Sequence, residues 1–129
     1  MKLLLDTHVW IWLLTDPDRL SGAARSALLA PDNQLHLSSA STWEISVKAA
    51  AGRLELDGSP ASLLQEAIVA SGVVALPIEH SHALQTGRLP RHHRDPFDRM
   101  LVAQAQTERL TLVTRDERLA AYDVKVLAA

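Results

Sequence analysis

The stretch Leu3-Leu4-Leu5-Asp6-Thr7-His8 decides the fold, because a short apolar run ends abruptly at polar residues. Consecutive leucines of this kind are typical of a strand that is buried on both faces, as in a parallel sheet. The residues that follow, 8–14, are mostly aromatic and aliphatic up to Asp16-Pro17, which predicts a short helix. The chain therefore begins as a strand followed by a helix.

The same alternation continues along the chain. We expect further strands at 35–37, 73–76, 110–114 and, as an edge strand, 125–127. We expect helices at 21–30, 41–52, 60–72, 79–86, from Pro96 onward and at 116–121. This order predicts an α/β fold with a mainly parallel central sheet and helices on both faces.

Composition fits a single domain over 1–129. The chain has 129 residues, of which 47% are hydrophobic and 22% charged, as in an ordinary globular domain. The absence of cysteine excludes disulfide scaffolds, cysteine-ligated zinc, iron–sulfur clusters and cysteine nucleophiles. A formal net charge of -2 does not indicate general nucleic-acid binding, but it permits a local basic patch.

The N-terminal apolar segment does not match a secretory signal. Asp6 and His8 interrupt it, and residues 9–14 fall short of the uncharged stretch that a signal peptide needs. The sequence contains no run of about 18–20 apolar residues that would span a membrane. We therefore expect an unprocessed, cytoplasmic protein with no membrane segment.

Four acidic residues lie where an α/β sheet would form a ligand pocket. Asp6 follows the first predicted strand, and Asp116 follows the fourth. Glu44 and Asp98 each lie in the first turn of a predicted helix. Ligands bind beyond the carboxyl ends of parallel strands, where the strand order reverses. If the first and fourth strands are neighbours, Asp6 and Asp116 meet at this end of the sheet.

Each of these acids also has a structural explanation. Acids stabilise helix N-termini by roughly 0.3–1 kcal/mol, and Asp6 and Asp116 each precede a predicted helix. Two segments match the capping-box pattern, Ser41-x-x-Glu44 and Thr114-x-x-Glu117. Asp95, directly before Pro96, is predicted to be an N-cap.

A cluster of four carboxylates would need protons or a cation. Two carboxylates about 5 Å apart repel by roughly 3 kcal/mol at an effective dielectric constant near 20. Mg²⁺ and Mn²⁺ take oxygen ligands, lower the pKa of a bound water and stabilise charge on an attacked phosphate. The acids together therefore indicate metal-assisted hydrolysis of a phosphodiester.

The chain resembles the PIN domain family, and within it the VapC-type toxins, the ribonuclease half of type II toxin–antitoxin pairs. The resemblance covers essentially the whole chain. It rests on Leu3-Leu4-Leu5-Asp6-Thr7-His8, on Ser41-x-Trp43-Glu44-Ile45, on Gly87-Arg88-Leu89-Pro90-x-His92-His93-Arg94-Asp95-Pro96-Phe97-Asp98-Arg99-Met100-Leu101, and on Thr114-Arg115-Asp116. It implies a PIN-like three-layer α/β/α sandwich and an endoribonuclease that depends on Mg²⁺ or Mn²⁺.

The resemblance also implies roles for the acidic quartet. Asp6 and Asp98 would be the principal metal ligands, and Asp116 would bind a second metal or a metal-bound water. Glu44 would orient or deprotonate the attacking water. Asp95 is kept as a helix cap that supports the site.

Other residues and partners follow from the same resemblance. Thr7 and Thr114 would hydrogen-bond the carboxylates or water. Besides the RNA substrate, the implied partners are a small antitoxin protein and a second copy of the chain in a homodimer. Whether the enzyme is a toxin or an RNA-processing nuclease without an antitoxin stays open.

The densest basic stretch, 88–94, is a second candidate for contact with RNA. The arginines in and near it are predicted to bind phosphates: Arg88, Arg91, Arg94, Arg99 and Arg115. The alternative is a solvated loop in which Arg94 pairs with a nearby acid. His92 and His93 are adjacent in a proline-containing loop, where metal binding is less favourable than for a helical pair, so neither is assigned to the site. We assign Trp10, Trp12 and Trp43 to core or dimer packing.

Three other classes of protein are weighed against the nuclease. A phosphorelay receiver domain would need an acceptor aspartate after a central strand and a lysine after a late strand, but Pro77 follows Leu76 and Lys125 begins the last strand. A haloacid-type phosphatase would need Asp-x-Asp-x-Thr, which Asp6-Thr7-His8 is not. A PIN-type binding module without catalysis would lack one of the four acids, and none is missing.

Overall fold

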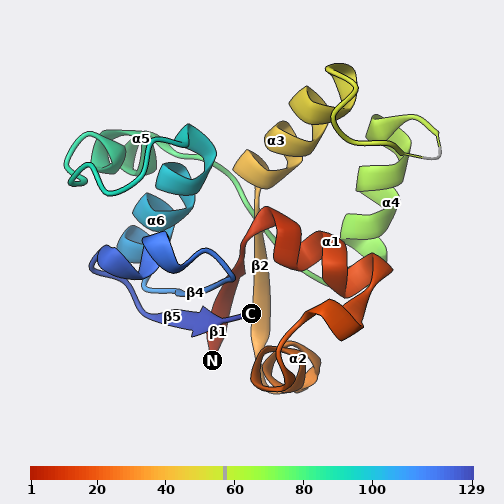
Figure 1. The fold of residues 1–129 in the computed structure, drawn as a ribbon, viewed down its shortest axis with the longest axis horizontal. Coiled ribbons are helices and arrows are strands. Elements are labelled where there is room, and N and C mark those ends of the chain that lie inside the picture. The colour runs from red at the N-terminus through yellow and green to blue at the C-terminus, as the bar shows by residue number, and fades with distance from the viewer. Residues whose placement is uncertain (57) are drawn as a thin grey trace.

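The elements alternate between strand and helix, as the sequence predicts (Figure 1). The structure is a computed structural model that describes residues 1–56 and 58–129. Its elements are β1 (Lys2–Leu5), α1 (Thr7–Thr15), the 3₁₀ helix η1 (Pro17–Arg19), α2 (Gly22–Leu29), β2 (Gln34–Ser38), α3 (Ser39–Ala50), α4 (Pro60–Ser71), β3 (Val74–Leu76), α5 (His80–Thr86), α6 (Pro96–Glu108), β4 (Thr111–Thr114), the 3₁₀ helix η2 (Glu117–Ala121) and β5 (Val126–Ala128). Each predicted strand is present, while η1 was not predicted.

The strands form one parallel sheet with the order β3-β2-β1-β4-β5. Leu4 of β1 lies opposite His36 of β2 on one side and Leu112 of β4 on the other. The order therefore reverses at β1, and the gap between the ends of β1 and β4 is where such sheets bind ligands. Receiver domains have the order 2-1-3-4-5, so the observed sheet excludes that class.

Alternate leucines of β1 face two separate cores. Leu3 and Leu5 pack in one core with residues of α1, α2 and α4, and Leu4 packs in the other with residues of α6. All three leucines are completely buried. In Figure 1, α5 and α6 lie to the left of β1 and β2, whereas α1 and α4 lie to the right. The predicted three-layer α/β/α architecture is therefore confirmed.

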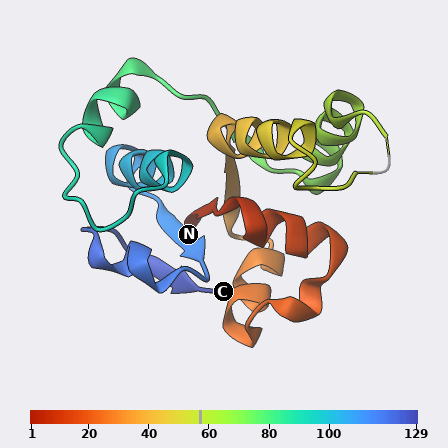
Figure 2. The same ribbon diagram turned by 45° about the horizontal axis from the view of Figure 1, so that its top comes forward.

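The first turns of α1, α3 and α6 converge near the same end of the central strands, which both views show (Figures 1 and 2). α1 follows β1 after Asp6 alone, and α3 follows β2 directly. Because β1 and β2 pair in register, their helices begin side by side. The connections are thus too short to move these helix starts away from the sheet edge.

Both predicted capping boxes are wrong. Helix α3 begins at Ser39 with Ser38 as its N-cap, so Ser41 lies inside the helix, where its Oγ accepts a hydrogen bond from Thr7 Oγ1 at 2.9 Å. The cap of η2 is Asp116, whose side chain accepts from the backbone N–H of Arg118. Neither Glu44 nor Thr114 is therefore explained by a capping box.

Asp95 caps α6, as predicted. Its Oδ1 accepts hydrogen bonds from the backbone N–H groups of Phe97 at 2.8 Å and Asp98 at 3.2 Å. Asp6 occupies the N-cap position of α1 but makes no capping bond with its side chain. No helix in the described part of the chain is both long enough and apolar enough to cross a membrane.

We expect Gly72→Ala to lower the free energy of unfolding by about 1 kcal/mol, because Gly72 ends α4 with a φ of 68°. Gly87→Ala is the matched control, since Gly87 has an ordinary φ of -68° and should change stability by less than about 0.5 kcal/mol. Urea denaturation of both variants checks this. Equal effects would contradict a conformational origin.

Candidate active site

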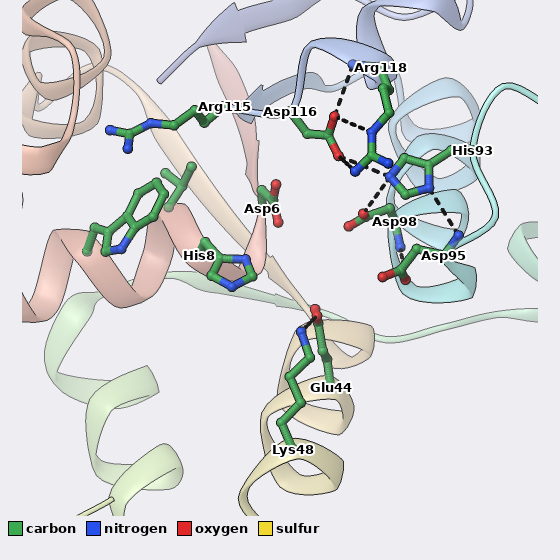
Figure 3. A pocket seen from close by; sticks show the side chains of 12 residues that line it. Asp6, His8, Glu44, Lys48, His93, Asp95, Asp98, Arg115, Asp116 and Arg118 are labelled. Atoms are coloured by element: carbon green, nitrogen blue, oxygen red, sulfur yellow. Dashed lines mark hydrogen bonds and ion pairs between the residues drawn. The ribbon is translucent and has the colours of Figure 1, made fainter. Parts of the chain in front are cut away.

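The four predicted acids line one pocket of about 410 Å³ at the carboxyl ends of β1 and β4 (Figure 3). Asp6 directly follows β1, and Asp116 lies two residues beyond the end of β4. Glu44 comes from α3 and Asp98 from the first turn of α6. Side chains from four separate elements thus converge on the switch point of the sheet.

Of the two acids that follow strands, Asp6 is more deeply buried than Asp116. The Asp6 residue is 7% exposed, and Thr114 Oγ1 donates a hydrogen bond of 2.6 Å to Asp6 Oδ2. The Thr114 hydroxyl also accepts from the backbone N–H of Asp116 at 3.0 Å, which ties the two acids together. Burial raises the pKa of Asp6, and the nearby Glu44 adds to this rise. Thr7 donates to Ser41 rather than to a carboxylate.

Asp98 has the most perturbed acid–base equilibrium in the pocket. Burial, followed by the negative charges of Asp6, Asp95 and Glu44, raises the pKa of Asp98 to about 8. Among the described residues, no lysine or arginine pairs with Asp6 or Asp98 to keep both of them ionised. A divalent cation is the ligand that would supply the positive charge.

His93 is part of the site, although the sequence led us to leave it out. Its Nε2 lies 3.0 Å from Asp116 Oδ2 and 3.2 Å from Asp98 Oδ2 (Figure 3). Its Nδ1 accepts a hydrogen bond from the backbone N–H of Asp95, so the ring carries its proton on Nε2 and donates a hydrogen bond to Asp116. The sequence did contain one signal for this role. His93 lies two residues before the predicted cap Asp95, whose backbone N–H holds the His93 ring at the start of α6.

Two cations of the pocket were also not predicted. Lys48 Nζ lies 2.5 Å from Glu44 Oε2, and the spacing of four residues along α3 could have indicated this pair. Arg118 forms a two-pronged contact with Asp116, with Nε 3.0 Å from Oδ1 and Nη2 2.8 Å from Oδ2. This contact lowers the pKa of Asp116.

The donor set fits a hard divalent cation. Glu44 is 2% exposed, and its Oε1 has no hydrogen-bond partner among the described residues. Ligand atoms of His93, Asp98 and Asp116 lie within 4.8 Å of one another. A buried, unpartnered carboxylate oxygen beside two carboxyl groups of raised pKa is what a site prepared for Mg²⁺ or Mn²⁺ would contain.

A second group, Glu79, His82 and Glu108, also brings possible ligand atoms together. Here His82 is completely buried, and its Nδ1 accepts from the backbone N–H of Glu79 at 3.0 Å. Its Nε2 lies 2.8 Å from Glu108 Oε1. The Nδ1 contact caps α5 and the Nε2 contact joins α5 to α6, so both ring nitrogens have structural roles.

The five arginines predicted to contact RNA have different surroundings. Arg88, Arg91 and Arg94 are exposed in the segment between α5 and α6, and no acid pairs with Arg94 among the described residues. The guanidinium of Arg99 instead donates to the carbonyl groups of Pro90 at 2.9 Å and Thr86 at 3.0 Å. RNA binding by Arg88, Arg91, Arg94 and Arg99 stays a prediction. The Arg99 guanidinium, however, already donates to backbone carbonyl groups.

Known proteins share both sequence and fold with this chain. The family model described as "PIN domain" matches residues 3–125. Ribonuclease VapC22 of Mycobacterium tuberculosis is 35% identical over 120 residues, which cover 92% of this chain and 90% of that protein.

Solved structures are similar at lower identity. The VapBC2 complex of Rickettsia felis, bound to a DNA fragment from its promoter, contains a chain that aligns with a TM-score of 0.73 at 17% identity and covers 99% of this chain and 98% of that chain. The DNA-bound VapBC complex of Salmonella typhimurium gives a TM-score of 0.72 at 18% identity over the same shares. These likenesses support the three-layer fold.

Without divalent ions, we expect the protein to lose stability as the pH rises from about 4 to about 8. Between the unfolded pKa of 3.8 and the folded pKa of about 8, the folded state holds a proton on Asp98 that the unfolded state has released. The slope is at most about 1.4 kcal/mol per pH unit. Asp98→Asn should flatten it, and the exposed control Asp32→Asn should not. Urea denaturation at stepped pH measures this, and equal slopes for wild type and Asp98→Asn would contradict it.

We expect Arg99→Lys to lower the free energy of unfolding by about 2 kcal/mol, because a lysine cannot reach the carbonyl groups that the planar guanidinium bridges. Arg88→Lys, at an exposed position, should stay within about 0.5 kcal/mol of wild type. Thermal and urea unfolding compare the two. Unchanged stability together with weaker RNA binding would instead support the phosphate contact.

Proposed function

Since the chain belongs to the PIN domain family, we propose that it is a divalent-metal-dependent endoribonuclease and the toxin of a toxin–antitoxin pair. The observation that carries this proposal is the convergence of Asp6, Glu44, Asp98 and Asp116 in one pocket at the switch point of the sheet. The name of the 35% identical relative, a ribonuclease, supports the reaction class.

We propose that Asp6 and Asp98 hold the principal metal ion, with Asp116 toward a second ion or its water. The raised pKa values of Asp6 and Asp98 support this, because a cation would relieve the repulsion that keeps protons on them. When bound, Mg²⁺ or Mn²⁺ supplies activation of water and neutralises charge on the attacked phosphate. Both ions prefer oxygen ligands, and the pocket suits either.

The residues of the chain prepare the site for in-line attack on phosphorus. Lys48 holds Glu44 Oε2, which leaves Oε1 to accept a hydrogen bond from the attacking water. The Nε2–H of His93 donates to Asp116 and lies 3.2 Å from Asp98 Oδ2, so the ring holds these two carboxyl groups apart. Thr114 fixes the rotamer of Asp6 in the same way. Each acid is thus positioned by a neighbour that does not itself react.

We propose three macromolecular partners for this chain: an RNA substrate, a small antitoxin protein and a second copy of the chain. Structurally similar chains come from VapBC complexes. One of these, VapBC-5 of Mycobacterium tuberculosis, is described as a member of the VapBC family of toxin–antitoxin systems. An antitoxin bound over the pocket would keep RNA out of it until the antitoxin dissociates. RNA and antitoxin would both meet the enzyme in the cytoplasm.

Purified protein should cut a labelled structured RNA with Mg²⁺ or Mn²⁺, and EDTA should stop the reaction. We expect Asp6→Asn and Asp98→Asn to lose at least about 100-fold in rate while they remain folded, because each removes a metal ligand. Asp32→Asn, an exposed acid in the α2–β2 turn, is the matched control and should cut like wild type. Rates are read from initial product formation on gels.

Two outcomes would contradict the proposal. Equal cutting by wild type and both pocket variants would point to a contaminating nuclease. If no RNA is cut and no thermal shift appears on addition of Mn²⁺, the chain is a non-catalytic PIN module.

A further inference from the structure

Arg115 is held at the rim of the carboxylate pocket by an aromatic side chain. Its guanidinium carbon lies 4.3 Å from the ring centroid of Trp12, which is short for a cation–π contact. An Nη2–H of Arg115 also donates to the backbone carbonyl of Arg19, whose own guanidinium lies 5.6 Å from the same ring. An arginine on the surface is thus kept in one orientation.

The charge of Arg115 is not neutralised by an acid, although Asp116 is its neighbour in the chain. No carboxylate lies within ion-pair distance of it among the described residues. Figure 3 shows its side chain extending away from Asp6 and Asp116. By contrast, Lys48 pairs with Glu44 and Arg118 with Asp116. Of the lysines and arginines that line the pocket, Arg115 is the one whose charge is available to a ligand.

A second cavity, of about 620 Å³, continues from the pocket between α1 and α3. His8, Trp12 and Lys48 line both cavities, so they lie at the junction. The described residues that line the second cavity also include Arg19 and Arg53, against a single acid, Asp16, which is 3.7 Å from Arg19. We name this cavity the α1–α3 groove, and its lining carries net positive charge.

We propose that Arg115, oriented by Trp12, binds a backbone phosphate of the RNA substrate. This phosphate would be the one next to the phosphodiester that is cut, where the RNA passes from the carboxylate pocket into the α1–α3 groove. This inference rests on the proposed ribonuclease function and extends it. A guanidinium recognises a phosphate through two parallel N–H···O bonds, and one that is already oriented loses less freedom on binding. Arg115 contacts substrate, whereas Trp12 is a positioning residue.

Binding of a fluorescein-labelled oligouridine of about 12 nucleotides tests the phosphate site, with every protein carrying Asp98→Asn so that the probe is not cut. We expect Arg115→Gln to weaken binding about tenfold at low salt. It should also reduce the salt slope by about 0.7, the value for one phosphate contact on a single strand. Arg109→Gln, near the amino ends of β1 and β4 and therefore at the opposite end of the strands, removes the same charge and should leave affinity unchanged.

The role of Trp12 requires a rescue experiment, because Trp12 also packs against a core. Trp12→Phe keeps an aromatic face under Arg115 and should bind within about threefold of the parent, whereas Trp12→Leu should lose nearly as much as Arg115→Gln. Trp12→Leu combined with Arg115→Gln should be no weaker than Arg115→Gln alone, since both act on one contact. Thermal unfolding shows which variants are folded.

The cleavage reaction separates this inference from the proposed function. In the active protein, Arg115→Gln should raise KM about tenfold with kcat within about twofold of wild type. If wild type cuts RNA but Arg115→Gln matches it in KM and in salt slope, the phosphate site is wrong and the nuclease stands. If no RNA is cut and Mn²⁺ causes no thermal shift, but Arg115→Gln still weakens oligouridine binding, the nuclease is wrong and the phosphate site stands. If an acidic peptide displaced the labelled oligouridine as well as unlabelled oligouridine does, the site would bind a protein partner, and the inference would be overturned.

Discussion

The parallel pairing of β1 with β2 on one side and β4 on the other is the constraint on which the site depends. It places Asp6 and Asp116 beside each other, because each follows its strand within two residues. The short connections to α1 and α3 leave no room for an alternative arrangement. The repulsion among the acids is therefore built into the topology, and a folded chain must carry it or neutralise it with protons or a cation.

The surrounding interactions divide the four acids into two groups. Asp116 is neutralised by Arg118 and stays ionised, while Asp6 and Asp98 are buried and hold protons more tightly than usual. A metal ion that displaces those protons would gain from both effects. The same pocket keeps its charged arginine and lysine neighbours paired, with the exception of Arg115. This division separates a region that holds a cation from a rim that attracts phosphate.

Strand positions and the acidic quartet were predictable because they depend on local pattern. Three leucines followed by Asp6 are typical of a buried strand that ends at a polar site, and Asp95-Pro96 fixes the start of α6. The capping box at Ser41 was wrong because α3 begins directly after β2, with Ser38 as its N-cap. The one at Thr114 was wrong because Asp116 caps η2 instead. Helix starts depend on how the chain leaves the sheet, which short motifs do not encode.

The contributions of His93 and Arg99 were not predictable from local pattern. His93 reaches Asp116 across 23 positions of sequence, and Arg99 donates to carbonyl groups of a loop that only folding brings near it. A basic loop looks the same in sequence whether its charges face solvent, RNA or the backbone. The distinction between Arg99 and Arg115 needs the positions of Pro90 and Trp12, which come from separate parts of the fold.

The most direct test of the central claim is a crystal structure grown with Mn²⁺ and measured for its anomalous scattering. The account predicts a manganese peak among Asp6, Asp98 and Asp116. In that structure His93 either contacts the ion itself or has moved away from Asp98 and Asp116. A peak at Glu79, His82 and Glu108 alone, or no peak in the pocket at an Mn²⁺ concentration that supports cleavage, would contradict it.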